Sequence, residues 1–149
     1  SYTTDTRFGT AQAHIRRAVE ICGVDPLYTI AQVEPIGPKK LLDALVIAPC
    51  TGNTLAKLSL GITDGAVTMA AKAHLRGDRP LLIALATNDG LSANLSNLNA
   101  MQKRKSVYFV PMNQDDPEKK PHSLVADFVQ VPTALEQALA GRQMRKLFL

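Results

Sequence analysis

Short, wholly apolar segments alternate with amphipathic segments along most of this chain. Apolar runs occupy residues 44–48, 81–86 and 107–110. Runs of this length without polar interruption are typical of strands in a parallel sheet that is covered on both faces. Apolar residues at helical spacing lie between and around these runs, at residues 11–22, 55–60, 66–73, 94–103 and 133–139. The alternation predicts an α/β fold in which a parallel sheet is sandwiched between two layers of helices.

Capping residues indicate where several of the helices begin and end. Gly23 is expected to end the first helix, because glycine readily adopts the left-handed conformation that closes many helices. Asp25 and Pro26 are typical of a helix start, so we predict a short second helix there. Asp64 is expected to cap the alanine-rich helix that follows it.

The segment after the first apolar run is the most informative part of the chain. Pro49 is expected to stop the strand, and Thr51, Gly52, Asn53 and Thr54 follow before a helical pattern begins. In open α/β sheets, ligands bind outside the carboxyl ends of the strands, often against the start of a helix. This turn offers hydroxyl groups, an amide and a close approach to the backbone. Its residue types fit simple helix capping by the first threonine or the asparagine equally well.

The second apolar run ends in a turn of the same kind. Thr87 and Asn88 follow the strand directly and precede Asp89 and Gly90. The asparagine is a candidate contact for a ligand at the carboxyl edge of the sheet, and a local turn stabilised by its side chain is the alternative. Together the two turns predict a pocket at this edge.

Two residues beside the first turn have simpler interpretations. Cys50 directly precedes the turn, where a small buried thiol is favoured over a functional one, because no obvious base lies near it in the sequence. Lys57 lies one turn into the following helix, where a solvated lysine is the plain alternative to a ligand contact. Cys22 lies on a different predicted element from Cys50, and the two show no metal-binding spacing.

Composition and charge narrow the class of protein. The 149 residues suit one domain with one core, and no apolar run approaches the roughly 20 residues of a membrane helix. The net charge of +4 is dispersed, and the chain has 5% aromatic residues and no tryptophan, which argues against a base-stacking surface for nucleic acid. Solvated surface explains the charges most simply, and a small anionic substrate comes next. Two free cysteines fit a reducing cytoplasm.

A charged loop is expected near the end of the chain. Residues 111–121 are rich in aspartate, proline and lysine, with the charges on Asp115, Asp116, Lys119 and Lys120. Solvated surface is again the simplest interpretation. The alternatives are a lid over a dianionic substrate or a surface that docks a partner protein.

The predicted sheet is small for a doubly wound fold. Three strands leave two exposed edges, and no strand precedes the first helix, at residues 11–22. We therefore expect either that the chain is part of a larger fold or that partners cover these edges.

The first turn and its surroundings resemble a known family. The pattern Ile47-Ala48-Pro49-x-Thr51-x-Asn53-Thr54-x-x-Lys57, followed by Gly61-Ile62-x-Asp64, is similar to the flavoprotein family that includes the homo-oligomeric flavin-containing cysteine decarboxylases. That family carries a Pro-Ala-Thr-Ala-Asn-Thr segment, then a lysine and a Gly-Ile-x-Asp. Further matching stretches occur in order at residues 6–9, 34–38, 69–73, 87–89, 114–117 and 119–121. The resemblance covers nearly the whole chain and implies a three-layer Rossmann or flavodoxin-like fold.

The resemblance implies FMN as the cofactor and a set of residues that contact it. Members of the family begin with a strand, a phosphate-binding turn, a helix and a second strand, so residues 1–149 are expected to form a single flavoprotein-like domain that lacks this N-terminal β-α-β unit. A serine or threonine after the second strand meets the FMN phosphate in the family, although a frayed terminus is an equal alternative here. The implied cofactor-binding residues are Thr4, Thr6, Phe8, Pro49, Thr51, Gly52, Asn53, Thr54, Thr87 and Asn88.

Departures from the decarboxylases are as informative as the matches. The decarboxylases use a histidine before the strand that leads into the first turn, but residues 33–38 contain none. They also use a reactive cysteine after their last strand, and residues 111–116 contain none. Of their Pro-x-Met-Asn segment, only Asn88 and its position remain. These losses argue against decarboxylation of a cysteine substrate.

Within the family, the chain is most similar to subunits from spore-forming bacteria that work beside a nicotinamide-dependent partner. The resemblance implies oxidation of a small dicarboxylate precursor to pyridine-2,6-dicarboxylate during sporulation. It implies FMN on this chain, NADP on the partner, a homo-oligomer, and the cytoplasm of the mother cell. No residue is assigned as the catalytic acid or base. A non-catalytic binding or assembly subunit with a vestigial flavin pocket is the main alternative, and an FMN-dependent decarboxylase ranks third.

Overall fold

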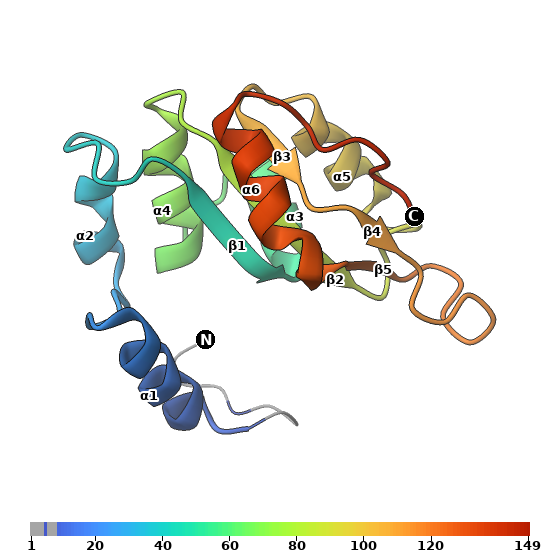
Figure 1. Ribbon diagram of the computed structural model, residues 1–149, viewed down its shortest axis with the longest axis horizontal. Coiled ribbons are helices and arrows are strands. Elements are labelled where there is room, and N and C mark those ends of the chain that lie inside the picture. Colours follow the sequence, from blue (N-terminus) through green and yellow to red (C-terminus); the bar gives the residue numbers. More distant parts are fainter. Residues whose placement is uncertain (1–4, 6–8) are drawn as a thin grey trace.

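The fold is a mixed sheet covered by helices on both faces (Figure 1). The structure is a computed structural model that describes residue 5 and residues 9–149. The strands are β1 (Leu45–Cys50), β2 (Leu81–Thr87), β3 (Val107–Phe109), β4 (Met112–Asn113) and β5 (Leu124–Ala126). β2 is central: β1 and β3 pair with it in parallel, and β5 pairs antiparallel with its last residues. β4 then pairs antiparallel with β5.

Helices cover both faces of the sheet, and one further helix lies apart from it. They are α1 (Ala11–Cys22), α2 (Ile30–Val33), α3 (Gly52–Leu60), α4 (Ala66–Leu75), α5 (Leu95–Gln102) and α6 (Val131–Leu139), with short 3-10 turns at Glu34–Ile36 and Phe128–Gln130. Figure 1 shows α6 crossing one face of the sheet, with α3 and α5 on the other side. α1 lies apart from the sheet in this view, and Ala11 is its buried residue.

Alternation along β2 explains the three layers. Leu81, Ile83 and Leu85 are fully buried in the core cluster shared with α3, α4 and α5. Leu82 and Ala84 point the other way, into the cluster that includes residues of α6. Because neighbouring side chains of a strand lie on opposite faces, a strand buried on both faces must be apolar throughout. The prediction of a covered α/β sheet is therefore confirmed.

Two strands were missing from the sequence-based expectation, and they make the sheet mixed rather than wholly parallel. β4 has two residues and β5 three, and they flank the charged loop. Segments this short carry too few residues to show a period of two. Their pairing depends on β2, whose Ala86 and Thr87 lie opposite Val125 and Leu124.

Pro49 does not stop the first strand as expected. β1 continues to Cys50, but its register shifts: Ile47 lies opposite Ile83, whereas Cys50 lies opposite Leu85. One extra residue is thus accommodated on β1. Proline lacks the N–H needed for a regular ladder, and an irregularity of this kind lets the strand pass through it.

The predicted helix start at Asp25 and Pro26 is also wrong. The helix begins at Ile30 instead, after Thr29. The Thr29 hydroxyl accepts from the backbone of Gln32, whose side chain accepts in return from the backbone of Thr29. This reciprocal capping box satisfies two otherwise unpaired N–H groups. Gly23 does close α1 in the left-handed conformation, as predicted.

Candidate functional site

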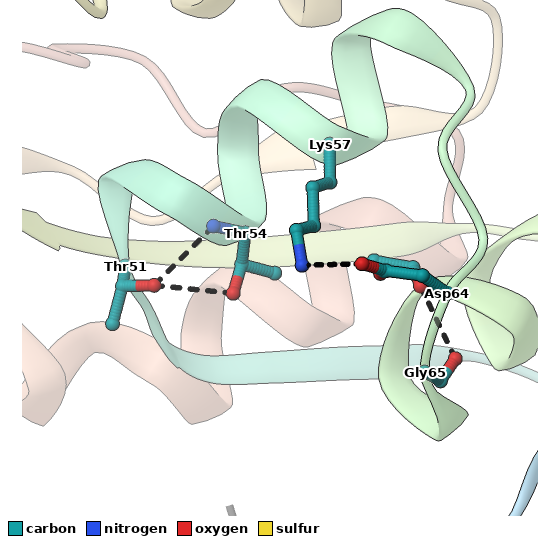
Figure 2. A network of polar contacts seen from close by, with 6 residues as sticks. Thr51, Thr54, Lys57, Asp64 and Gly65 are labelled. Atoms are coloured by element: carbon teal, nitrogen blue, oxygen red, sulfur yellow. Dashed lines mark hydrogen bonds and ion pairs between the residues drawn. The ribbon is translucent and has the colours of Figure 1, made fainter.

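The start of α3 is organised by Thr51, as Figure 2 shows. Its hydroxyl accepts a hydrogen bond from the backbone N–H of Thr54 at 3.3 Å. The two threonine hydroxyl oxygens lie 3.1 Å apart. Of the two capping residues considered from the sequence, Thr51 is therefore the N-cap, and Asn53 is left exposed on the first turn of the helix.

An ion pair holds the far end of this region together. Lys57 Nζ donates to Asp64 Oδ2 at 2.7 Å, which links α3 to the loop before α4 (Figure 2). The hydrogen bond from Lys57 lowers the pKa of Asp64 below its ordinary value of 3.8. The lysine side chain is only 31% exposed, so it is not simply solvated. The prediction that Asp64 caps α4 is wrong, because the N-cap is Gly65 and the carboxylate is engaged by the lysine.

A cavity of about 710 Å³ opens between this ion pair and the start of α3. Its polar lining includes Asn53, Thr54 and Lys57. Its apolar lining includes Leu27, Ile30 and Val67, which are all substantially exposed. Small-molecule sites have volumes of roughly 300–1,000 Å³, with mostly apolar walls and a few polar groups that fix orientation. The cavity therefore has the size of a small-molecule site, with polar and apolar residues mixed in its lining.

Thr87 and Asp89 in the turn after β2 bond to neighbouring side chains and do not line the cavity, whereas Asn88 is exposed. The Thr87 hydroxyl donates to Asp89 Oδ1 at 2.5 Å. The Asn94 amide donates to both carboxylate oxygens of Asp89, at 3.0 and 2.9 Å. These bonds, first that from Thr87 and then those from Asn94, lower the pKa of Asp89 below its ordinary value of 3.8. The carboxylate is therefore held in its ionised form by neutral donors.

Gly52 brings the two turns into contact. A Cβ atom at this position would lie 2.5 Å from Thr87 Oγ1 and 2.6 Å from Asn94 Nδ2. Both distances are shorter than real Cβ contacts, so only glycine fits without a shift. The close approach anticipated at this glycine is thus to the second turn of the same protein.

The structure separates the residues expected to bind a cofactor. Asn53 and Thr54 line the cavity. Gly52 and Thr87 lie close to each other and do not line it. Pro49 and Asn88 are exposed at the ends of β1 and β2. The three N-terminal residues, Thr4, Thr6 and Phe8, lie outside the described part of the chain, and their assignment stays a prediction.

Other side chains considered from the sequence have clear surroundings. Cys50 is buried, and burial raises the pKa of its thiol to about 12, so it is protonated at neutral pH. In the charged loop, which projects from the sheet in Figure 1, Lys120 and Ser123 both donate to Asp115. Those bonds lower the pKa of Asp115 to about 2. Asp115, Lys119 and Lys120 are all exposed, so the loop is a solvated surface on which some charges also pair with one another.

Several residues of the site were not found by sequence reasoning. Tyr28 and Thr29 line the cavity from the segment before α2, and Asp89 and Asn94 hold the second turn. The first two were hidden because the segment was expected to be helical. Asp89 was recognised in the sequence only as part of a turn, and nothing in the local pattern marks Asn94, which follows Ala93, as its partner.

Comparisons with known proteins show which family the chain resembles. The chain is 40% identical to the B subunit of dipicolinate synthase from Bacillus subtilis (strain 168) over 147 residues, which is 99% of this chain and 74% of that protein. It is 31% identical over 72 residues to the flavin prenyltransferase UbiX of Chlamydia muridarum (strain MoPn / Nigg), which is 48% of this chain and 38% of that protein.

Solved structures show the same relationship. The crystal structure of the dipicolinate synthase B subunit from Bacillus halodurans C superposes with a TM-score of 0.90 at 39% identity, covering 98% of this chain and 75% of that one. The FMN-dependent cysteine decarboxylase SpaF superposes with a TM-score of 0.63 at 24% identity, covering 86% and 74%, and shows the shared fold. Residues 10–131 match the family described as Flavoprotein. The chain therefore belongs to the flavoprotein family.

Proposed function

We propose that this chain is the flavoprotein-like B subunit of a dipicolinate synthase. The observation that carries the proposal is the similarity to two such proteins over 98–99% of the chain, in a fold that superposes with a TM-score of 0.90. The cavity at the first turn supports it, because it lies where the motif of the family predicts the cofactor. In this proposal, the chain works in the cytoplasm of the mother cell of a sporulating bacterium.

FMN is the proposed cofactor, and the cavity fits its ring system. The apolar walls suit the flat faces of the ring, and Asn53 and Thr54 supply hydrogen-bonding groups for its polar edge. Lys57 contributes positive charge that is partly compensated by Asp64. A bound flavin would supply a two-electron acceptor. By the family resemblance, the FMN phosphate would lie toward the N-terminal residues Thr4, Thr6 and Phe8.

The proposed reaction removes two electrons and two protons from a dihydrodipicolinate-type precursor to give pyridine-2,6-dicarboxylate. In this proposal the substrate is a small dicarboxylate. Asn88, which is exposed at the end of β2 and does not line the cavity, is the residue proposed to orient it. The partner, the A subunit of dipicolinate synthase, would carry NADP. We further propose that this chain assembles as a homo-oligomer, since β1 has one unpaired edge among the described strands and exposed edges are commonly covered.

A second candidate is a non-catalytic binding or assembly subunit that keeps a vestigial flavin pocket. The state of the cysteines and carboxylates favours it. Cys50 is buried with a pKa of about 12, and Asp64 is neutralised by Lys57, so neither is an evident acid, base or nucleophile. A decarboxylase is disfavoured because residues 111–116 contain no cysteine to match the reactive one of that family.

Reconstitution separates these candidates. The purified chain is mixed with the A subunit, and the rate of pyridine-2,6-dicarboxylate formation is measured with and without added FMN, together with the flavin absorbance of the protein. A yellow protein that raises the rate supports the proposal. A colourless protein that still raises the rate supports the non-catalytic alternative. Formation at the full rate when this chain is omitted overturns a catalytic role for it.

A variant tests whether the cavity holds the ring. Asn53→Ala is expected to weaken FMN binding about tenfold, the size of effect when one well-placed hydrogen bond is lost. Asn99→Ala removes an exposed asparagine from α5 and serves as the matched control. FMN binding is measured by quenching of flavin fluorescence. Equal affinities in wild type and Asn53→Ala would remove this asparagine from the site.

A further inference from the structure

A network of polar side chains that do not line the proposed pocket connects the turn after β2 with α5 and α3. It begins at Asp89, whose carboxylate accepts from Thr87 at 2.5 Å and from Asn94 at 2.9 and 3.0 Å. Asn94 is 7% exposed, so its bonds are shielded from water. It stands at the N-cap position of α5, yet its side chain makes no capping bond there. The oxygen that could cap the helix accepts from the Asn97 side chain instead, while the NH₂ group donates to the carboxylate.

The network continues from α5 to α3. Asn94 Oδ1 accepts from Asn97 Nδ2 at 2.9 Å, and Asn97 Oδ1 accepts from the Ser59 hydroxyl at 2.6 Å. Ser59 lies on the last turn of α3. The turn after β2 is therefore tied to the helix whose first turn carries the cavity residues.

Asp89 also lies against the first turn of α3. Its Oδ1 would be 2.9 Å from a Cβ atom placed on Gly52, the first residue of that helix. A negative charge beside a helix N-terminus interacts favourably with the helix dipole. The two ends of α3 are thus held by one network, through Gly52 at the start and Ser59 near the end.

We propose that Asp89 is a positioning residue for the proposed FMN pocket: its carboxylate holds the turn after β2 against the start of α3, and so sets where Asn53 and Thr54 stand. The inference rests on the proposed function. Asp89 does not line the cavity and acts through its neighbours. Its two kinds of partner, a hydroxyl and an amide, both donate, so the role requires a group that accepts from both.

The variant Asp89→Asn tests this requirement. Its amide keeps the size of the carboxylate, but it turns a donor toward the Asn94 donor or loses the bond from Thr87. We expect FMN affinity, measured by fluorescence quenching on the folded full chain, to fall about tenfold. The control Asp78→Asn makes the same chemical change at a surface carboxylate that pairs with Lys105, and it should leave the affinity unchanged.

A swapped pair distinguishes positioning from loss of the fold. In the double variant Asp89→Asn with Asn94→Asp, the amide at position 89 can donate to the carboxylate at position 94, and the bonds from Thr87 and Asn97 find acceptors. FMN affinity should return to within about threefold of wild type. Should the single variant fail to fold, the folded double variant and Ser59→Ala provide the measurement instead. Ser59→Ala removes the bond to Asn97 together with a local bond to the Ala56 carbonyl of the same helix. Ser59→Ala is expected to weaken FMN binding two- to threefold.

The outcomes separate this inference from the proposed function. A wild-type chain that binds no FMN overturns the proposed function, and the positioning role toward a flavin with it. A wild-type chain that binds FMN, with Asp89→Asn binding equally well, overturns the positioning role alone. A folded double variant that does not recover the affinity also overturns the positioning role. Where Ser59→Ala is used in place of the single variant, unchanged affinity in Ser59→Ala overturns it as well. Thermal unfolding of each variant is recorded beside the titration, so that affinity is compared only among folded proteins.

Discussion

The turns after β1 and β2 occupy equivalent places in the fold but differ in what they face. Both follow a parallel strand at the carboxyl edge of the sheet. The first turn directs Asn53 and Thr54 into a cavity of about 710 Å³. In the second turn, Thr87 and Asp89 bond within the protein: Thr87 and Asn94 both donate to the Asp89 carboxylate. Equivalent position in an α/β sheet therefore does not predict equivalent exposure, because each hydroxyl and amide binds the partner that its own neighbours supply.

The two regions also stabilise a carboxylate in different ways. Asp64, beside the cavity, is ionised because a lysine donates to it. Asp89, which does not line the cavity, is ionised because the neutral side chains of Thr87 and Asn94 donate to it. A charged partner is sensitive to ions in the solvent, whereas a set of oriented neutral dipoles is much less so. We therefore expect the pKa of Asp64 to depend on the salt concentration and the pKa of Asp89 to depend on it much less.

Among the predicted changes, a substitution at the contact between the two turns should lower the free energy of unfolding most. Gly52→Ala places a methyl group 2.5 Å from Thr87 Oγ1 and 2.6 Å from Asn94 Nδ2, so these side chains or the turns that carry them must shift. Overpacking of this kind costs about 2 kcal/mol of unfolding free energy. Urea denaturation checks the change. Gly65→Ala is the control, because its Cβ would meet nothing within 4 Å. Equal losses in the two variants would show that the turns do not press on each other here.

The cap of α3 should have a smaller effect that is confined to the first turn. Thr51→Ala removes the hydroxyl that accepts from the Thr54 N–H. Loss of such a cap costs about 1 kcal/mol of unfolding free energy. Thr51→Ser keeps the hydroxyl and should recover most of the loss in the same denaturation assay. If alanine and serine are equivalent, the bond at 3.3 Å contributes nothing measurable.

The two carboxylates should respond differently to salt, which is the smallest of these effects. Both have a folded-state pKa below 3.8, so each contributes stability above that pH and loses it as the pH falls through the folded value. Raising the salt concentration should move the pKa of Asp64 back toward 3.8 and leave that of Asp89 nearly unchanged. Carboxyl NMR titrations at low and high salt measure both. A parallel shift of the two values would contradict the distinction between charged and neutral partners.

Much of the central fold follows from local pattern. Apolar runs predicted β1, β2 and β3 to within two residues at each end, because strands buried on both faces must be apolar throughout. The C-terminal ends of α1 and α3 were also predicted, at residues 22 and 60. The glycines that follow, Gly23 and Gly61, adopt the left-handed conformation that closes a helix. Capping by Asp25 or Asp64 was wrong, because capping preferences are weak beside a reciprocal box at Thr29 or a nearby lysine.

The sequence alone determined the family and predicted a ligand site at the residues from Thr51 to Thr54. No helix in the described part of the chain is long and apolar enough to cross a membrane, as the absence of long apolar runs had indicated. Only the tertiary structure decided which of the polar residues face the cavity and which support it. The reason is physical: the contact of Gly52 with Thr87 and Asn94 joins segments that are distant in the sequence, and no local pattern records such a contact.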